Sequence, residues 1–213
     1  MRFGLFSAAL LTSTLVSATV PIDGWYSNVF GGYSYIPNNL STYRNGYYFS
    51  NDSFQSGYNV GGRFGYKSNP LRYEGEVTYI NGDLSSFKLN NARQSHIDGS
   101  INDVAVMANI YYDFPEAVRG IEPYLGFGIG YNWVRTSLTS KIPTGILTSY
   151  SDSDTSFAYQ GLAGLSFNYI EYLSLNIEYR YLGTNTITYL GKIFQTDMVS
   201  AGVTYRFDGN RYK

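Results

Sequence analysis

The segment FAYQGLAGLSFNYIEYLSLNIEYRYL, residues 157–182, decides the fold because apolar and polar side chains alternate along each of its halves. In the first half, one set of alternate positions is apolar, aromatic or small: Tyr159, Gly161, Ala163, Leu165, Phe167 and Tyr169. In the second half, the apolar positions are Leu173, Leu175, Ile177, Tyr179 and Tyr181, and the polar positions between them are Ser174, Asn176, Glu178 and Arg180. Side chains on a strand point to opposite faces with a period of two. The segment therefore predicts a β-hairpin with one apolar face and one polar face.

The same alternation recurs along the chain and predicts eight strands. Two of them form this hairpin, and the others cover residues 25–36, 54–67, 71–80, 102–114, 121–134 and 195–207. Long polar connections are expected at residues 37–53, 81–101, 135–156 and 183–194, and the connections between them are short. Alternating long and short connections are typical of outer-membrane barrels, which have short periplasmic turns and longer extracellular loops.

The aromatic side chains agree with a membrane-spanning sheet. Aromatic residues lie near the predicted strand ends, where the girdles at the membrane interfaces are found: Trp25, Tyr35, Tyr66, Tyr79, Tyr112, Phe114, Trp133, Tyr169, Tyr181 and Phe207. In lipid, an open sheet edge would leave backbone groups without hydrogen-bond partners, so the sheet must close. We therefore expect an all-β fold, an eight-stranded antiparallel up-and-down transmembrane β-barrel.

Composition restricts the function classes. The chain has 213 residues, enough for one domain, and no cysteine, which excludes disulfides and Cys-ligated metal. Charged residues make up 15%, below the ~25% that is usual for soluble domains. With 15 Lys and Arg against 16 Asp and Glu, the chain has no basic excess, so a nucleic-acid partner is not expected.

Residues 1–18 have the features of a removable export signal. Arg2 supplies the positive charge, an apolar run follows, and Val16, Ser17 and Ala18 precede the expected cleavage site. The apolar run is shorter than the ~20 residues that a spanning helix needs. The barrel domain is then expected over residues 19–213, in the cell outer membrane.

Several motifs resemble the small outer-membrane barrels of Gram-negative bacteria: PYLGFGIGY (123–131), FAYQGLAGLSF (157–167), LSLNIEYRYL (173–182) and VTYRF (203–207). This family includes the transmembrane domain of outer membrane protein A, the opacity proteins and the surface-antigen porin-like proteins. The resemblance implies that Tyr205 and Phe207 form the C-terminal signal read by the barrel-assembly machinery. Residues 208–213 follow that signal here, whereas in the family the signal usually closes the sequence.

The polar faces of the strands carry charges of both signs, and in a closed barrel these side chains point into the lumen. The expected inward charges are Arg63, Arg72, Glu74, Glu76, Asp103, Glu178, Arg180 and Arg206. Antiparallel pairing across a turn at residues 68–70 places Arg63 nearly opposite Glu74, with Glu76 diagonal to it. Buried charges persist only when they are paired, so the sequence predicts a lumen polar network of Arg63, Arg72, Glu74, Glu76, Glu178 and Arg180. The alternative is a gated, narrow ion path.

Nothing in the sequence points to an enzyme or to a cofactor. The single histidine, His96, lies near Asp98 and Ser100 in a long polar connection, whereas catalytic triads are assembled in space by a rigid scaffold. The glycines at 126, 128 and 130 lie within a strand and have no following helix, so they are not a nucleotide-binding motif. We expect them instead to keep the barrel wall thin beside bulky lumen side chains.

The function expected from these features is that of a monomeric outer-membrane surface protein of the adhesin or structural type. Its partners would be the lipid bilayer with its lipopolysaccharide, the barrel-assembly machinery and a host surface ligand bound by the long loops, where binding residues concentrate. A small-solute channel is the main alternative. A soluble lipocalin-like carrier is a third, and it would require the aromatic faces to point inward.

Overall fold

The computed structural model describes residues 23–36, 42–44, 47–50, 55–84, 88–89, 92–93, 97–116, 118, 120–141, 147–187 and 192–207. The predicted export signal, His96 and residues 208–213 lie outside these ranges. Within them, no helix is long and apolar enough to cross a membrane.

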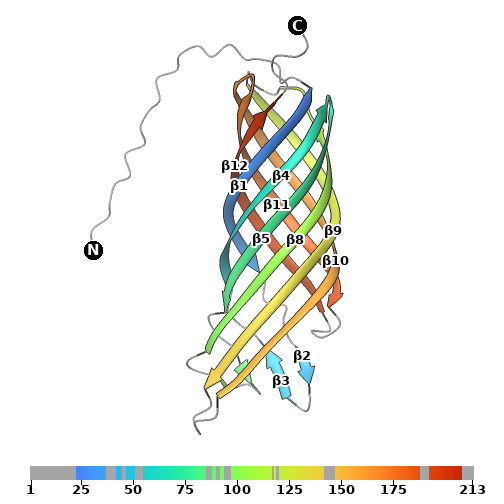
Figure 1. The fold of residues 1–213 in the computed structure, drawn as a ribbon. Coiled ribbons are helices and arrows are strands. Elements are labelled where there is room, and N and C mark those ends of the chain that lie inside the picture. The colour runs from blue at the N-terminus through green and yellow to red at the C-terminus, as the bar shows by residue number, and fades with distance from the viewer. Residues whose placement is uncertain are drawn as a thin grey trace, which may run out of the picture.

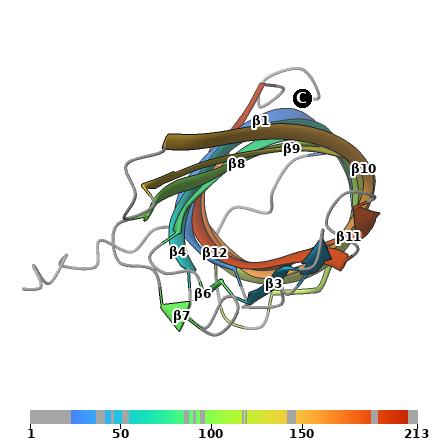
Figure 2. The same ribbon diagram turned by 90° about the horizontal axis from the view of Figure 1, so that it is seen from below.

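Eight of the described strands form one closed antiparallel barrel, as the sequence predicted. They are β1 (Gly24–Ile36), β4 (Gln55–Ser68), β5 (Leu71–Leu84), β8 (Ile97–Asp113), β9 (Ile121–Lys141), β10 (Leu147–Ile170), β11 (Leu173–Ile187) and β12 (Lys192–Arg206). Each pairs with its neighbours along the chain, and β1 pairs with both β4 and β12, which closes the sheet (Figures 1 and 2). Closure leaves no sheet edge within the wall, as lipid requires.

We call the two ends of the barrel the turn end, where the short connections lie, and the loop end, where the long connections lie. Strand β1 begins at the turn end, with Gly24, and β12 ends there, with Arg206. A small sheet of β2 (Thr42–Arg44), β3 (Tyr47–Ser50), β6 (Lys88–Leu89) and β7 (Ala92–Arg93) is built from the first two long connections.

Six of the eight barrel strands are longer at the loop end than the sequence predicted, whereas β1 and β4 end there within one residue of the prediction. Strand β9 continues to Lys141 and β10 begins at Leu147, so most of residues 135–156, predicted as a loop, is a paired hairpin. Strand β8 also begins earlier, at Ile97. The sequence pattern missed these extensions because the residues there are mostly Ser, Thr and Asp, and the alternation of apolar and polar positions ends before the strands do.

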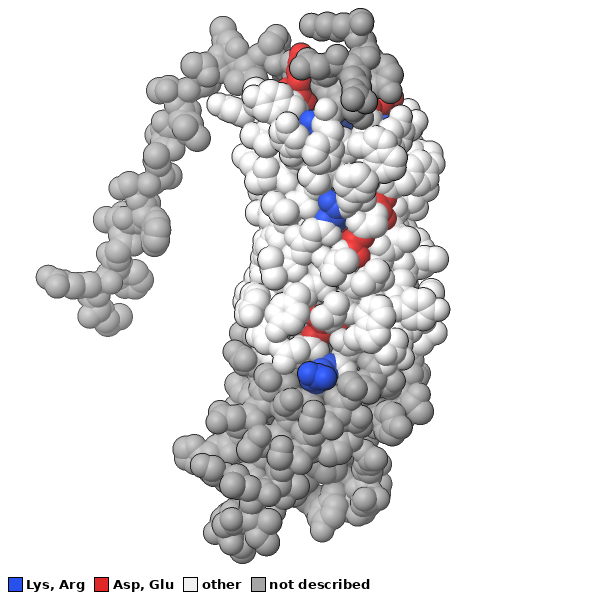
Figure 3. Space-filling model, viewed as in Figure 1, with Lys and Arg blue, Asp and Glu red and all other residues white. Residues whose placement is uncertain are grey.

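The two faces of the wall are as predicted, with the apolar face outside. Tyr73, Val77, Leu175 and Ile177 are about half exposed, whereas Glu74 is 5% and Arg180 is 0% exposed. On the face of the barrel shown in Figure 3, uncharged side chains dominate the described surface and charged atoms are few. A soluble carrier would need the opposite arrangement.

The β4–β5 register differs from the prediction by two positions. Arg63 lies directly opposite Glu76, and it is Glu74 that lies diagonal to Arg63. The length of the turn accounts for one of these positions: a turn of residues 68–70 would put Arg63 opposite Gly75, but Ser68 still pairs with Leu71, so the turn consists of residues 69–70 alone. The other position lies in the prediction itself, which placed Arg63 only nearly opposite Glu74.

Candidate functional site: the filled lumen

A closed ring of four ion pairs crosses the middle of the lumen. Arg63 Nε lies 2.8 Å from Glu76 Oε2, and Glu76 Oε1 lies 2.6 Å from Arg180 Nη1. Arg180 Nη2 lies 3.1 Å from Glu178 Oε1, which in turn lies 2.5 Å from Arg63 Nη2. The four side chains come from β4, β5 and β11, so the ring ties together strands from separate parts of the wall.

Neutral side chains add hydrogen bonds to both glutamates of this ring, whereas Arg180 Nε has no acceptor among the described residues. Thr78 and Asn109 donate to Glu76 at 2.6 and 2.8 Å, and Tyr124 donates to Glu178 at 3.2 Å. Gln160 donates to Asn109 at 2.7 Å. Because buried ions are stable only when they are paired and hydrogen-bonded, this surrounding shell allows the charges to remain inside a membrane-spanning barrel.

The aromatic ring of Phe30 is shared by both arginines of the ion-pair ring. The guanidinium carbons of Arg63 and Arg180 lie 4.3 and 4.6 Å from its centroid. A cation over an aromatic face is attracted to the ring quadrupole, more strongly when it is desolvated. Phe30 therefore holds the two arginine planes in place.

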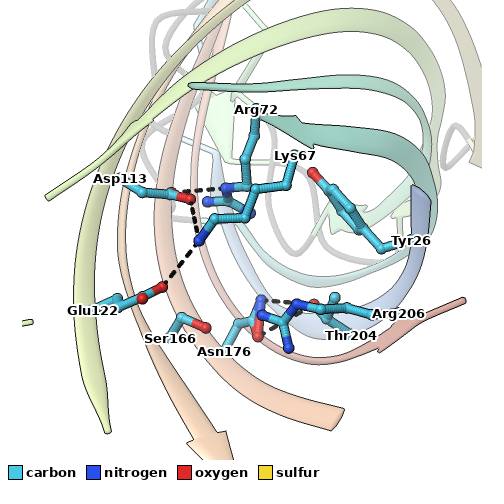
Figure 4. Close-up of a pocket in the computed structure, with 9 residues that line it drawn as sticks. All are labelled: Tyr26, Lys67, Arg72, Asp113, Glu122, Ser166, Asn176, Thr204 and Arg206. Atoms are coloured by element: carbon cyan, nitrogen blue, oxygen red, sulfur yellow. Dashed lines mark hydrogen bonds and ion pairs between the residues drawn. The ribbon is translucent and has the colours of Figure 1, made fainter. Parts of the chain in front are cut away.

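Further ion pairs lead from this ring to the turn end. Glu74 lies 3.6 Å from Arg63 and 3.4 Å from Arg72, and it also accepts a hydrogen bond from the Tyr26 hydroxyl. Arg72 pairs with Asp113 at 2.7 Å. Asp113 then pairs with Lys67 at 3.0 Å, and Lys67 with Glu122 at 3.2 Å (Figure 4).

All six residues of the predicted polar network therefore belong to one continuous chain of ion pairs. The prediction did not include Lys67, Asp113 and Glu122, although all three lie at inward positions of their strands. The available signal was their charge at alternate positions that continue the inward faces of β4, β8 and β9.

An apolar belt closes the lumen on the loop side of the ion pairs. Its side chains are buried and inward-facing: Ile36, Ile80, Ala105, Met107, Val134, Ala158, Leu182 and Met198. The alternation along the strands predicted a polar inward face and not this belt. Apolar residues at inward positions, such as Leu182 two residues beyond Arg180, were the available signal.

Asp103 lies beside this belt and outside the ion-pair network. It is fully buried and pairs in register with Ile80 and Val134. Asn132 donates to one of its carboxylate oxygens at 3.0 Å, and no described donor reaches the other. Among the described residues, no cation lies within ion-pair distance of Asp103, which sets it apart from the other inward carboxylates.

The glycines of β9 make room for lumen side chains. A Cβ on Gly126 would collide with the Tyr111 ring, and one on Gly128 with the Asn109 amide. A Cβ on Gly130 would collide with the Val106 carbonyl oxygen. The expectation that these glycines keep the wall thin is confirmed.

Tyr205 and Phe207 lie on the outer surface at the turn end, 47% and 53% exposed. Their ring centroids are 5.3 Å apart, and the Phe207 ring lies 6.3 Å from that of Phe64. The Phe207 amide donates to the Trp25 carbonyl at 3.0 Å, across the seam where β12 meets β1. These two aromatic residues thus lie at the point where the barrel closes.

A family model described as "Outer membrane protein beta-barrel domain" matches residues 6–207. The chain belongs to this family. It is an outer-membrane protein, embedded in the lipid bilayer through the wall described above, and the resemblance seen in the sequence motifs is confirmed.

Two sequence relatives and one solved structure illustrate the family. An outer membrane protein of Gluconacetobacter diazotrophicus is 26% identical over 203 residues, which cover 86% of this chain and 53% of that protein. The chain thus spans about half the length of this relative. An uncharacterised protein of Brucella abortus is 44% identical over 84 residues, or 37% of this chain and 29% of that protein. The crystal structure of Neisserial surface protein A shares the fold, with a TM-score of 0.57, 21% identity and coverage of 86% of this chain and 97% of that one.

Proposed function

We propose that this outer-membrane barrel is a surface protein whose loop end contacts host or environmental surfaces. The observation that carries the proposal is the length of the strands at that end. Strand β10 has 24 residues, about 80 Å at ~3.3 Å per residue, whereas a crossing of the bilayer takes ~9–11 tilted residues.

The extension is a regular sheet. Strands β9 and β10 pair without interruption from Ile121 and Phe167 at the turn end to Lys141 and Leu147 at the loop end (Figure 1). Strand β8 pairs with β9 as far as Ile97. In this class of barrel, the long connections face outward from the cell. A paired sheet holds its backbone in a fixed arrangement, which lowers the entropic cost of binding a surface.

The contents of the lumen argue against the alternative of a small-solute channel. An eight-stranded barrel has an interior just wide enough for side chains to fill it. Here the ion-pair ring and the apolar belt occupy successive levels, and a hydrophobic constriction also resists the passage of ions. We expect planar-bilayer recordings of the purified protein to show no large stable conductance, and reproducible openings of porin size would contradict this.

The surface-contact function can be tested by shortening the projecting hairpin. Residues 136–152 are replaced by Asn-Gly, a pair suited to a tight hairpin turn. Cells that display this variant should adhere to cultured epithelial cells and to glass no better than cells without the protein, while heat-modifiable gel migration shows an intact barrel. Undiminished adherence with equal surface display would contradict the proposal.

The remaining partners follow from the same arrangement. We infer that Tyr205 and Phe207 are read by the barrel-assembly machinery, that lipopolysaccharide surrounds the outer half of the wall, and that the barrel functions as a monomer. The exposed aromatic pair at the closing seam supports the first of these inferences.

A further inference from the structure

The lumen has a small pocket at the turn end, lined in part by the ion pairs that lead away from the ring. Arg72 and Lys67 line it on one side, and Arg206, Asn176 and Thr204 line it on another (Figure 4). In this class of barrel, the short-turn end faces the periplasm. Because the ion-pair ring and the apolar belt close the lumen further in, a ligand would enter this pocket from the periplasmic side.

The carboxylates of the pocket are already engaged. Arg72 Nε lies 2.7 Å from Asp113 Oδ1, and Lys67 Nζ lies 3.0 Å from Asp113 Oδ2. Glu122 lies 3.2 Å from the same lysine. Two cations thus hold the two acidic side chains that line the pocket.

Arg206 is the exception among the cations of the pocket. It is 9% exposed, and its two terminal nitrogens donate to neutral oxygens, Ser174 Oγ at 2.6 Å and Asn168 Oδ1 at 3.3 Å. No carboxylate of the described residues lies within ion-pair distance of it. A cation that is mostly buried and has no anionic partner favours the binding of an anion.

Two more N–H donors at this level have no acceptor among the described residues. They are Nη2 of Arg72, a residue that is 8% exposed, and Nδ2 of Asn168. Arg72 is held rigidly, because its guanidinium carbon lies 4.6 Å from the centroids of both the Tyr111 and Tyr124 rings. Arg72 lines the pocket and Asn168 contacts Arg206, which lines it too, so the cations at this end of the lumen have donor capacity left for a ligand rich in acceptor oxygens.

We propose that this pocket binds a small oxyanion, a carboxylate or a phosphate, between the guanidinium groups of Arg72 and Arg206. The limited room in the pocket restricts the ligand to a small ion or to the terminal group of a larger molecule. The preorganised Arg72 lowers the ordering cost of binding. This site is independent of the surface contacts at the loop end.

Calorimetric titration of the purified full chain in a maltoside detergent, which carries no charged group, tests the proposal. Sodium phosphate and sodium acetate are titrated at pH 7 against sodium chloride at matched ionic strength. Saturable binding of at least one of the two oxyanions beyond the chloride signal is expected. Its absence in the wild-type protein overturns the proposal, whatever the variants do.

Variants then locate the site. Arg206→Gln should weaken the binding at least tenfold, and Arg206→Lys should weaken it less because the charge remains. Arg135→Gln, an exposed arginine of β9 near the loop end, is the matched control and should bind as the wild type does. Equal affinity of Arg206→Gln and wild type overturns the proposal.

Discussion

At the scale of single residues, two buried carboxylates in the same lumen have opposite surroundings. Glu76 contacts Arg63 and Arg180 and accepts hydrogen bonds from neutral neighbours, so its charge is compensated. Asp103 is equally buried, but among the described residues only the Asn132 amide donates to it. A buried charge is costly unless it is paired, so the two carboxylates should contribute with opposite signs to stability.

We expect Glu76→Gln to lower the free energy of unfolding by about 3–5 kcal/mol, because it leaves two buried arginines short of a partner. Asp103→Asn, the matched control, should leave the stability unchanged or raise it, since it removes a charge without a cationic partner. Urea unfolding in lipid vesicles, followed by the fluorescence of Trp25 and Trp133, measures both. If both variants lost the same free energy of unfolding, this account of the lumen would be contradicted.

The glycines of the wall allow a second comparison. A Cβ on Gly130 would collide with a backbone carbonyl, whereas a Cβ on Gly161 meets nothing within 4 Å. Gly130→Ala should therefore destabilise the barrel by about 1–3 kcal/mol, as overpacking does. Gly161→Ala should leave the free energy of unfolding unchanged. The same urea experiment measures both variants. If Gly161→Ala proved as harmful as Gly130→Ala, steric room would not be the reason for the glycines.

At the scale of the strands, the sequence predicts most where lipid imposes the alternation. All eight barrel strands were predicted within a few residues at the turn end. At the loop end the prediction was short for six of the eight strands, because a strand that leaves the bilayer no longer needs an apolar face. The β4–β5 register was missed for another reason: it depends on whether Ser68 still pairs with Leu71, and periodicity alone does not show this.

The last strand, β12, carries a prediction about assembly. Phe207→Ala should reduce the amount of folded protein in the outer membrane several-fold if the machinery reads Tyr205 and Phe207. Phe64→Ala is the matched control, because Phe64 is also 53% exposed at the same rim and lies on β4. Heat-modifiable protein in outer-membrane fractions is the readout. An equal reduction in both variants would mean that the aromatics act only by packing at the membrane interface.

At the scale of the whole molecule, the barrel has three levels in its lumen. The turn end holds a pocket with unused donors, the middle holds the ion-pair ring, and the loop side holds the apolar belt. The sequence predicted the four residues of the ion-pair ring, with Arg72 and Glu74 beside them, from their inward positions and opposite charges. It did not predict the belt or the pocket, because both depend on which inward side chains from distant strands meet, and strand alternation only gives the face on which each one lies.

The central claim is that the apolar face of every barrel strand meets lipid and that the charged face fills the lumen. The chain has no cysteine, so single cysteines can be placed along β11, at residues 175–180, and spin-labelled without background. In lipid vesicles, collision with oxygen should be high for labels at Leu175, Ile177 and Tyr179, and low for labels at Asn176, Glu178 and Arg180. The opposite alternation would contradict the account. So would labels at Asn176, Glu178 and Arg180 that a water-soluble relaxation agent reaches while it does not reach labels at Leu175, Ile177 and Tyr179.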